Sequence, residues 1–237
     1  MERIFSFDQA GYPFHLFSLS HLLMIGLSFG LVTCLFTFRE RIREQYKRPF
    51  KYMLVVLLIL GELSFHLWYI VHDRWDVQLN LPLQLCSISL YLCTIMLLTK
   101  NYKVFEVSFF VSMTGAFIAI LTPELFFGFP HMRFIHFFIV HITIVIACFY
   151  MVWVEEFKPA FASVIRAFAV LNILAGFVCI INKMIGSNYM FLAEKTSNAS
   201  ILDFLGPYPW YILSLEVLAL ALFMLIYVAL FKSTRNK

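Results

Sequence analysis

Seven apolar segments divide this chain, and nearly all are long enough to cross a lipid bilayer as an α-helix. A bilayer core takes about 20 apolar residues in helical form. With 62% hydrophobic and only 14% charged residues, the chain has the composition of a multi-pass membrane protein. The expected helices lie near residues 17–38, 52–72, 83–98, 104–123, 134–154, 163–183 and 209–231, and the third is the shortest.

The sequence predicts a single all-α domain over residues 1–237. No low-complexity segment or shift in composition separates a second domain. Residues 1–16 lack a basic region followed by an apolar core and a cleavage site, so we expect insertion to use the first helix. The five cysteines all fall in apolar segments, which is not the pattern of a secreted disulfide framework.

Lysine and arginine predict the orientation of the helices, since short cytoplasmic loops carry an excess of both. Four of these residues lie on the side that holds the N-terminus and twelve on the other, so we expect the N-terminus outside and the C-terminus in the cytoplasm of a multi-pass cell membrane protein. The net charge of +4 comes from these linkers, where it meets anionic lipid headgroups and gives no reason to expect nucleic acid. The twelve are Arg39, Arg41, Arg43, Lys47, Arg48, Lys51, Lys100, Lys103, Lys158, Lys232, Arg235 and Lys237.

Polar side chains within the expected spans gather in the outer half of the membrane. Each ionisable group in a span costs roughly 2.5–3.5 kcal/mol, so such groups face a bundle interior or a wet cavity. The sequence therefore predicts a cavity open toward the outer side. Its candidate residues are His21, Glu62, His66, Gln84, Cys86, His136, His141, Asn182 and Glu216.

Cys86 is the candidate nucleophile, in the stretch Asn80 to Ser87. Pro82 fits the first position of a helix, which would put Cys86 about one turn further in, where the helix N-terminus favours a thiolate. The alternative is that Cys86 is a small apolar membrane residue. A catalytic role requires a base, because a buried thiol is mostly protonated at neutral pH.

Histidine is the base expected for such a thiol. His136 and His141 are five residues apart, roughly 140° around a helix, so we expect only one of them to face a shared site. His141 is deeper and is the better candidate, whereas His136 fits the interface. Glu62 and His66, at i and i+4, form either a proton relay or a structural pair. No diagnostic metal-ligand spacing or nucleotide-binding motif is present, so we expect no metal and no cofactor.

The segment from Met184 to Pro209 is the longest loop on the expected outer side, and it is rich in turn-forming residues. A loop of this kind is typical of a lid over a cavity mouth. Its aromatic residues also fit the interfacial belt of a membrane protein.

Two stretches carry a resemblance to a known family: Leu81-Pro82-Leu83-Gln84-Leu85-Cys86-Ser87, and Asn188-Tyr189-Met190-Phe191-Leu192 followed by Leu205-Gly206-Pro207-Tyr208-Pro209-Trp210-Tyr211. Together they resemble the YwaF-like family of bacterial integral membrane proteins over nearly the whole chain. A distantly similar eukaryotic branch contains a cysteine-centred phospholipid acyltransferase, and that branch looks like intramembrane lipid hydrolases that use Thr and His.

The resemblance implies that Cys86 accepts an acyl group and that His141 is the base. It also implies membrane phospholipid as acyl donor and acceptor. From their place in the outer half and the outer loop, we expect supporting or substrate-binding roles for Gln84, His21, Glu62, His66, Asn182, Asn188 and Tyr189, although the resemblance does not match them residue by residue. Two other classes stay open: a binding or transport protein with proton-coupled histidines and Glu62, and a non-catalytic membrane protein. The sequence does not predict the oligomeric state.

Overall fold

The computed structural model describes residues 2–8, 11–195 and 201–232, and within these ranges the chain is helical with no β-strand. Seven long helices confirm the expected all-α fold. They are α2 Leu19–Arg41, α3 Lys47–Val71, α4 Leu85–Thr99, α5 Tyr102–Leu121, α6 Met132–Trp153, α7 Phe161–Ile185 and α8 Trp210–Tyr227. The short elements are α1 Glu2–Phe5, the π-helical turns η2 Ile42–Tyr46 and η5 Val228–Lys232, and the 3-10 turns η3 Tyr189–Phe191 and η4 Ile201–Leu205.

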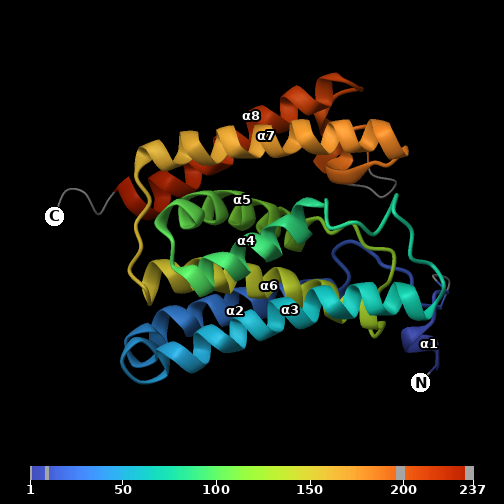
Figure 1. Cartoon of the computed structure of the whole chain (residues 1–237). Helices are drawn as coiled ribbons and strands as arrows, with labels where there is room; N and C mark the ends of the chain where they lie inside the picture. Colours follow the sequence, from blue (N-terminus) through green and yellow to red (C-terminus); the bar gives the residue numbers. More distant parts are fainter. Residues whose placement is uncertain (1, 9–10, 196–200, 233–237) are drawn as a thin grey trace.

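Five helical runs are long and apolar enough to cross a membrane. The first, Leu19–Val71, contains both α2 and α3, because the chain reverses through η2, which follows α2 directly and leads directly into α3 (Figure 1). The other four are α5, α6, α7 and α8 with its last turns, whereas α4 has 15 residues and is shorter than a full span. The lengths follow from the apolar segments, so the expected and observed helices differ by only a few residues at most of their ends.

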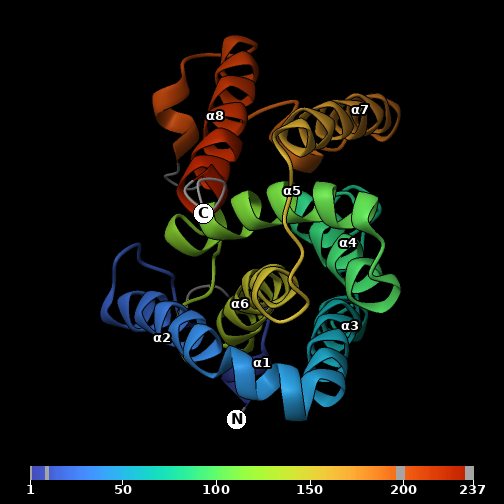
Figure 2. The same cartoon turned by 90° about the vertical axis from the view of Figure 1, so that its left-hand side faces the viewer.

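The bundle is organised around α6. Viewed along the helices, α6 lies in the middle of a group with α2, α3, α4 and α5, and α7 and α8 lie beyond α5 (Figure 2). Most of the apolar stretches of α5 and α6 are buried, whereas only 22% of the α7 stretch and 6% of the α8 stretch are. Ile173 on α7 and Val217 on α8 are about 70% exposed, at 71% and 69%. Apolar surface of this extent is stable in lipid, so the outer faces of α7 and α8 are membrane-facing.

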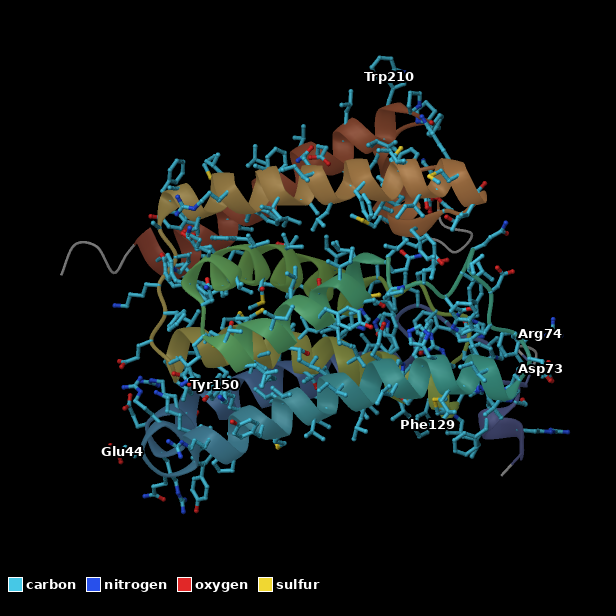
Figure 3. The ribbon with its side chains drawn as sticks, in the orientation of Figure 1. Glu44, Asp73, Arg74, Phe129, Tyr150 and Trp210 are labelled. Carbon is cyan, nitrogen blue, oxygen red and sulfur yellow. The ribbon has the colours of Figure 1, made fainter. Side chains whose placement is uncertain are left out.

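Polar groups collect at the two ends of the bundle. Figure 3 shows Glu44 at one end and Asp73 and Arg74 at the other. We call the first the linker end, formed by η2, residues 100–101 and residues 154–160, and the second the loop end, formed by residues 72–84, 122–131 and 186–192. Helix α1 lies at the loop end and the last turns of α8 at the linker end (Figure 1). Which end faces the cytoplasm stays a prediction from the basic residues.

A cluster of charged side chains around Glu155 links three helix ends at the linker end of the bundle. The carboxylate of Glu155 lies 3.1 Å from Lys47 Nζ and 2.7 Å from Lys100 Nζ, and it accepts a 3.0 Å hydrogen bond from the Tyr150 hydroxyl. Burial alone would raise the pKa of Glu155, but hydrogen bonds from Lys100, Lys47 and Tyr150 outweigh it and lower that pKa below its ordinary value. Glu155 therefore joins the start of α3, the end of α4 and the end of α6.

A second ion pair, which the sequence reading did not single out, lies inside the membrane-spanning part. Glu106 of α5 accepts hydrogen bonds from Arg166 and from the Ser163 hydroxyl, both of α7. The Glu106 side chain is buried, and the Arg166 Nε to Glu106 Oε2 distance is 3.1 Å. The contact joins α7 to the rest of the bundle at the linker end.

Candidate functional site

A cavity of about 450 Å³ extends from the loop end toward the middle of the bundle. Its volume lies within the roughly 300–1,000 Å³ that is usual for ligand sites. Most of its polar lining comes from α3, α4 and α6 and the loops at the loop end, and much of its apolar lining comes from α5, α7 and α8. The polar lining includes Glu62, Gln84, Cys86, Ser87, Thr122, Glu124, Arg133, His136, His141 and Glu216, and the apolar lining includes Val111, Ile118, Leu171, Leu215 and Phe223.

Cys86 is the second residue of α4, closer to the helix start than expected. The prediction that Pro82 begins this helix is wrong: residues 81–83 form a turn in which Leu83 N–H donates to Leu81 O over 2.7 Å, and the helix begins at Leu85. Cys86 is a free cysteine, exposed in the bundle, and it lines the cavity. Its place at the start of α4 puts Cys86 among the first backbone N–H groups of the helix, which have no partner within the helix itself.

His141 lines the same cavity with one ring nitrogen available. Its Nδ1 is 2.7 Å from the carbonyl oxygen of Phe137, and a carbonyl oxygen only accepts, so Nδ1 carries the hydrogen. In the neutral ring Nε2 is then the unprotonated nitrogen. No hydrogen bond to Nε2 occurs among residues 2–8, 11–195 and 201–232. The ring therefore offers a lone pair, which is what a general base requires.

His136 also lines the cavity, which corrects the expectation that only one of these two histidines faces it. Because α6 lies in the middle of the bundle, the cavity follows it over a wide arc, and side chains 140° apart both reach it. Both nitrogens of His136 are engaged: Nε2 donates to Gly61 O over 2.8 Å, and Nδ1 accepts from Arg133 Nη1 over 3.0 Å. His136 therefore joins α3 to α6 and has no free lone pair for a base.

Glu62 and His66 form a hydrogen-bonded network beside the cavity. The indole N–H of Trp75 donates to His66 Nδ1 over 3.1 Å, so His66 Nε2 carries the hydrogen that faces Glu62 Oε1 at 3.4 Å. Glu62 also accepts from the Ser87 hydroxyl at 3.4 Å and the Tyr91 hydroxyl at 3.3 Å. Glu62 lines the cavity and His66 does not, so the pair orients the start of α4 against α3.

Gln84 connects the candidate nucleophile to the loop that follows α7. It is the N-cap residue of α4, and its side-chain oxygen accepts from Met190 N–H over 3.0 Å. Its amide nitrogen, which donates no hydrogen bond within the described parts of the chain, remains available to the cavity that Gln84 lines. Gln84 therefore offers a donor close to Cys86.

Asn182, Asn188 and Tyr189 lie outside the cavity and shape the loop that covers it. Asn182 accepts from Tyr189 N–H and donates to Tyr189 O, both over 2.9 Å. Asn188 accepts from Ala193 N–H and Glu194 N–H, which closes the next turn. The Tyr189 hydroxyl donates to Val77 O and accepts from Leu81 N–H, so it fixes the loop to the segment before α4.

The covering part of this loop is apolar. Met190, Phe191, Leu192 and Leu202 all line the cavity. The Tyr211 hydroxyl donates to Phe191 O and holds this segment to the start of α8. Parts of the 184–209 segment therefore border the cavity, and residues 196–200 lie outside the described residues. That this segment acts as a lid stays a prediction.

The structure does not bring His21 to the cavity. Its Nε2 donates to Ile120 O over 2.9 Å, and its Nδ1 accepts from Phe17 N–H over 3.0 Å. Both nitrogens are thus used to start α2 and to attach it to α5. Among the described residues, the His, Cys, Asp and Glu side chains form no group of three or more that could hold a metal ion.

Arg133 is the cavity residue whose importance the sequence reading missed. It is not among the candidates selected from the sequence, yet it lines the cavity with Cys86 and His141 and contacts His136 directly. The available signal was its spacing, since Arg133 and His136 are i and i+3 on one helix and share a face.

A bundle of apolar helices around a partly polar cavity defines an integral membrane protein. The chain belongs to the TMEM164 family, whose family model matches residues 16–227. That match spans all seven long helices, α2 to α8. No curated protein and no solved structure matches the chain.

Proposed function

We propose that this protein is an intramembrane lipid acyltransferase or hydrolase of the cell membrane, with Cys86 as nucleophile and His141 as general base. One observation carries the proposal: a cavity-facing thiol at a helix start and an imidazole with an unengaged Nε2 line the same space. The proposal also agrees with what the resemblance of residues 81–87 to the YwaF-like family implies, since a distant branch of that family contains a cysteine-centred phospholipid acyltransferase. The substrates we propose are membrane phospholipids, as acyl donor and acceptor.

The first half-reaction transfers an acyl group to the protein. His141 Nε2 takes the proton of the Cys86 thiol, and the thiolate attacks the carbonyl carbon of a lipid ester. A carbon–sulfur bond forms, the ester carbon–oxygen bond breaks, and the proton on His141 passes to the departing alcohol oxygen. The products are a thioester on Cys86 and a lysolipid.

The second half-reaction returns the thiol. The hydroxyl of a second lipid, or water, gives its proton to His141 and attacks the thioester carbonyl. The sulfur leaves and recovers the proton from His141. A lipid acceptor makes the protein a transferase and water makes it a hydrolase, so the acceptor that the cavity admits decides between the two.

The oxyanion formed in each half-reaction needs donors close to the sulfur. We assign this role to the backbone N–H groups of Cys86 and Ser87, in the first turn of α4, and to the amide nitrogen of the N-cap residue Gln84. The apolar part of the cavity, lined by residues such as Leu171 and Phe223, suits the acyl chain.

The test is acyl exchange between phospholipids in proteoliposomes, followed by mass spectrometry of the lipids. We expect the wild-type protein to transfer or release acyl chains and Cys86→Ser to abolish both. Cys179→Ser is the matched control, because this cysteine also lies in an apolar helix but does not line the cavity, and it should stay active. Equal activity of Cys86→Ser and the wild-type protein would overturn the proposal.

A binding or transport function is the second candidate. It is favoured by the carboxylate of Glu62, which lies in the cavity wall next to His66 and could carry a proton with a transported ligand. A transporter should move a ligand into proteoliposomes under a pH gradient, with loss of flux in Glu62→Gln and no effect of Cys86→Ser. Lipid turnover without any flux would eliminate this candidate.

A further inference from the structure

The guanidinium group of Arg133 lies in the cavity wall, held by aromatic rings and one imidazole. Its central carbon lies 4.6 Å from the ring centroid of Phe65, with Trp68 and Tyr69 at 5.6 and 5.8 Å. Its Nη1 donates to His136 Nδ1 over 3.0 Å. These contacts fix the position of the charge but supply no negative partner.

No carboxylate lies within ion-pairing distance of Arg133 in the described parts of the chain. By contrast, Arg166 of α7 pairs with Glu106. Glu62, which also lines the cavity, is engaged by His66 and two hydroxyls. Arg133 is the second residue of α6, at the loop end, and its charge lies in the cavity wall without a counter-ion. A charge held in that position is suited to receive its counter-ion from a ligand.

We propose that Arg133 binds the phosphate of a phospholipid in this cavity. The inference rests on the proposed function and deepens it, because it assigns the group that selects a phosphate-bearing lipid over a neutral ester. Arginine is suited to the role, since its planar fork of donors matches phosphate oxygens in a bidentate contact. With the phosphate at Arg133, the ester lies toward Cys86 and the acyl chain toward the apolar lining from α5, α7 and α8.

The test measures binding without turnover, so it does not depend on the thiol chemistry. Full-length Cys86→Ser protein in nanodiscs is exposed to three photoreactive probes: a phosphatidylcholine, a diacylglycerol and a free fatty acid. We expect the Cys86→Ser protein to bind the phosphatidylcholine probe in preference to the other two. In the double variant that also carries Arg133→Gln, this binding should fall about tenfold, which corresponds to about 1.4 kcal/mol of binding free energy. Diacylglycerol binding should be unchanged, and Arg133→Lys should retain part of the preference.

Arg74→Gln is the matched control, because Arg74 lies at the same end of the bundle but does not line the cavity (Figure 3). Its variant should bind all three probes as Cys86→Ser does. Undiminished phosphatidylcholine binding after Arg133→Gln would overturn the proposal, and so would a parallel loss of diacylglycerol binding, which a structural role predicts. Loss of fatty acid binding alone would also overturn it, because Arg133 would then bind the carboxylate of a fatty acid and not a phosphate. Failure of the proposed chemistry would instead appear as missing acyl transfer with Cys86 intact and this selectivity preserved.

Discussion

His141 donates its Nδ1 hydrogen to the carbonyl oxygen of Phe137, one turn earlier on the same helix, over 2.7 Å. This bond fixes the neutral tautomer, so Nε2 is the nitrogen that can take a proton. His136, the other histidine of the cavity, uses both nitrogens in contacts with Gly61 and Arg133. The two residues are chemically alike but differently engaged, and their variants should therefore behave differently.

His141→Gln should lower acyl transfer by about 10²–10⁴-fold, the usual contribution of a general base. It should change the unfolding temperature in detergent little, since a glutamine fills a similar space. His136→Gln should instead lower the unfolding temperature, because it weakens the contact between α3 and α6. Initial rates and thermal unfolding of both variants check this, and full activity of His141→Gln would contradict the assignment of the base.

Gly61 permits the close approach of α3 and α6. A Cβ at this position would lie 2.6 Å from Val140 Cγ2, a branched side chain in the packed interior. Gly61→Ala should therefore destabilise the bundle by about 1–3 kcal/mol, as overpacking does. Gly30→Ala is the control, because its Cβ would meet nothing within 4 Å, and it should be neutral or stabilising. Unfolding midpoints that fall equally in both variants would contradict this explanation.

The ion pairs of Glu155 should make the folded protein less stable as the pH becomes acidic. The pKa of Glu155 is lowered in the folded protein, so its stabilising effect is present above the unfolded-state pKa and is lost as pH falls through the folded-state pKa. Unfolding temperatures in detergent should therefore fall between about pH 5 and the folded-state pKa. Glu155→Gln should be less stable near neutral pH and should show a shallower fall. A wild-type slope in this variant would contradict the contribution of Glu155.

Tyr189 should control access to Cys86. Its hydroxyl bridges Val77 O and Leu81 N–H, and Tyr189→Phe removes both bonds while keeping the ring. We expect faster alkylation of Cys86 by a polar maleimide, because the covering loop would open more often. Tyr208→Phe is the control, since Tyr208 is an exposed ring of the same loop. Equal alkylation rates in the wild-type protein and Tyr189→Phe would contradict a covering role.

The helices could be predicted from the sequence because span length and apolar content leave few alternatives. The start of α4 could not, since Pro82 satisfies the local rule for a helix start while the chain makes one further turn before Leu85. The Glu106 to Arg166 pair was also missed, because it depends on which helices are neighbours, and the pattern along a single helix does not contain that information.

The sequence predicted which residues form the candidate site better than it predicted how those residues are arranged. Cys86 and His141 were chosen from depth and residue chemistry, and the structure brings both to one cavity. The engagement of His136 and His21 depends on backbone carbonyls of other helices, so no sequence pattern signals it. Their roles, and those of the remaining candidates, stay predictions.

The central claim is that Cys86 carries an acyl group during turnover. The most direct measurement is mass spectrometry of the intact protein and its peptides after an acid quench during incubation with phospholipid. The account predicts an acyl adduct on Cys86 that neutral hydroxylamine removes and that Cys86→Ser lacks, with Cys179→Ser behaving as the wild-type protein does. Lipid turnover without any adduct on Cys86, or with full rate in Cys86→Ser, would contradict it.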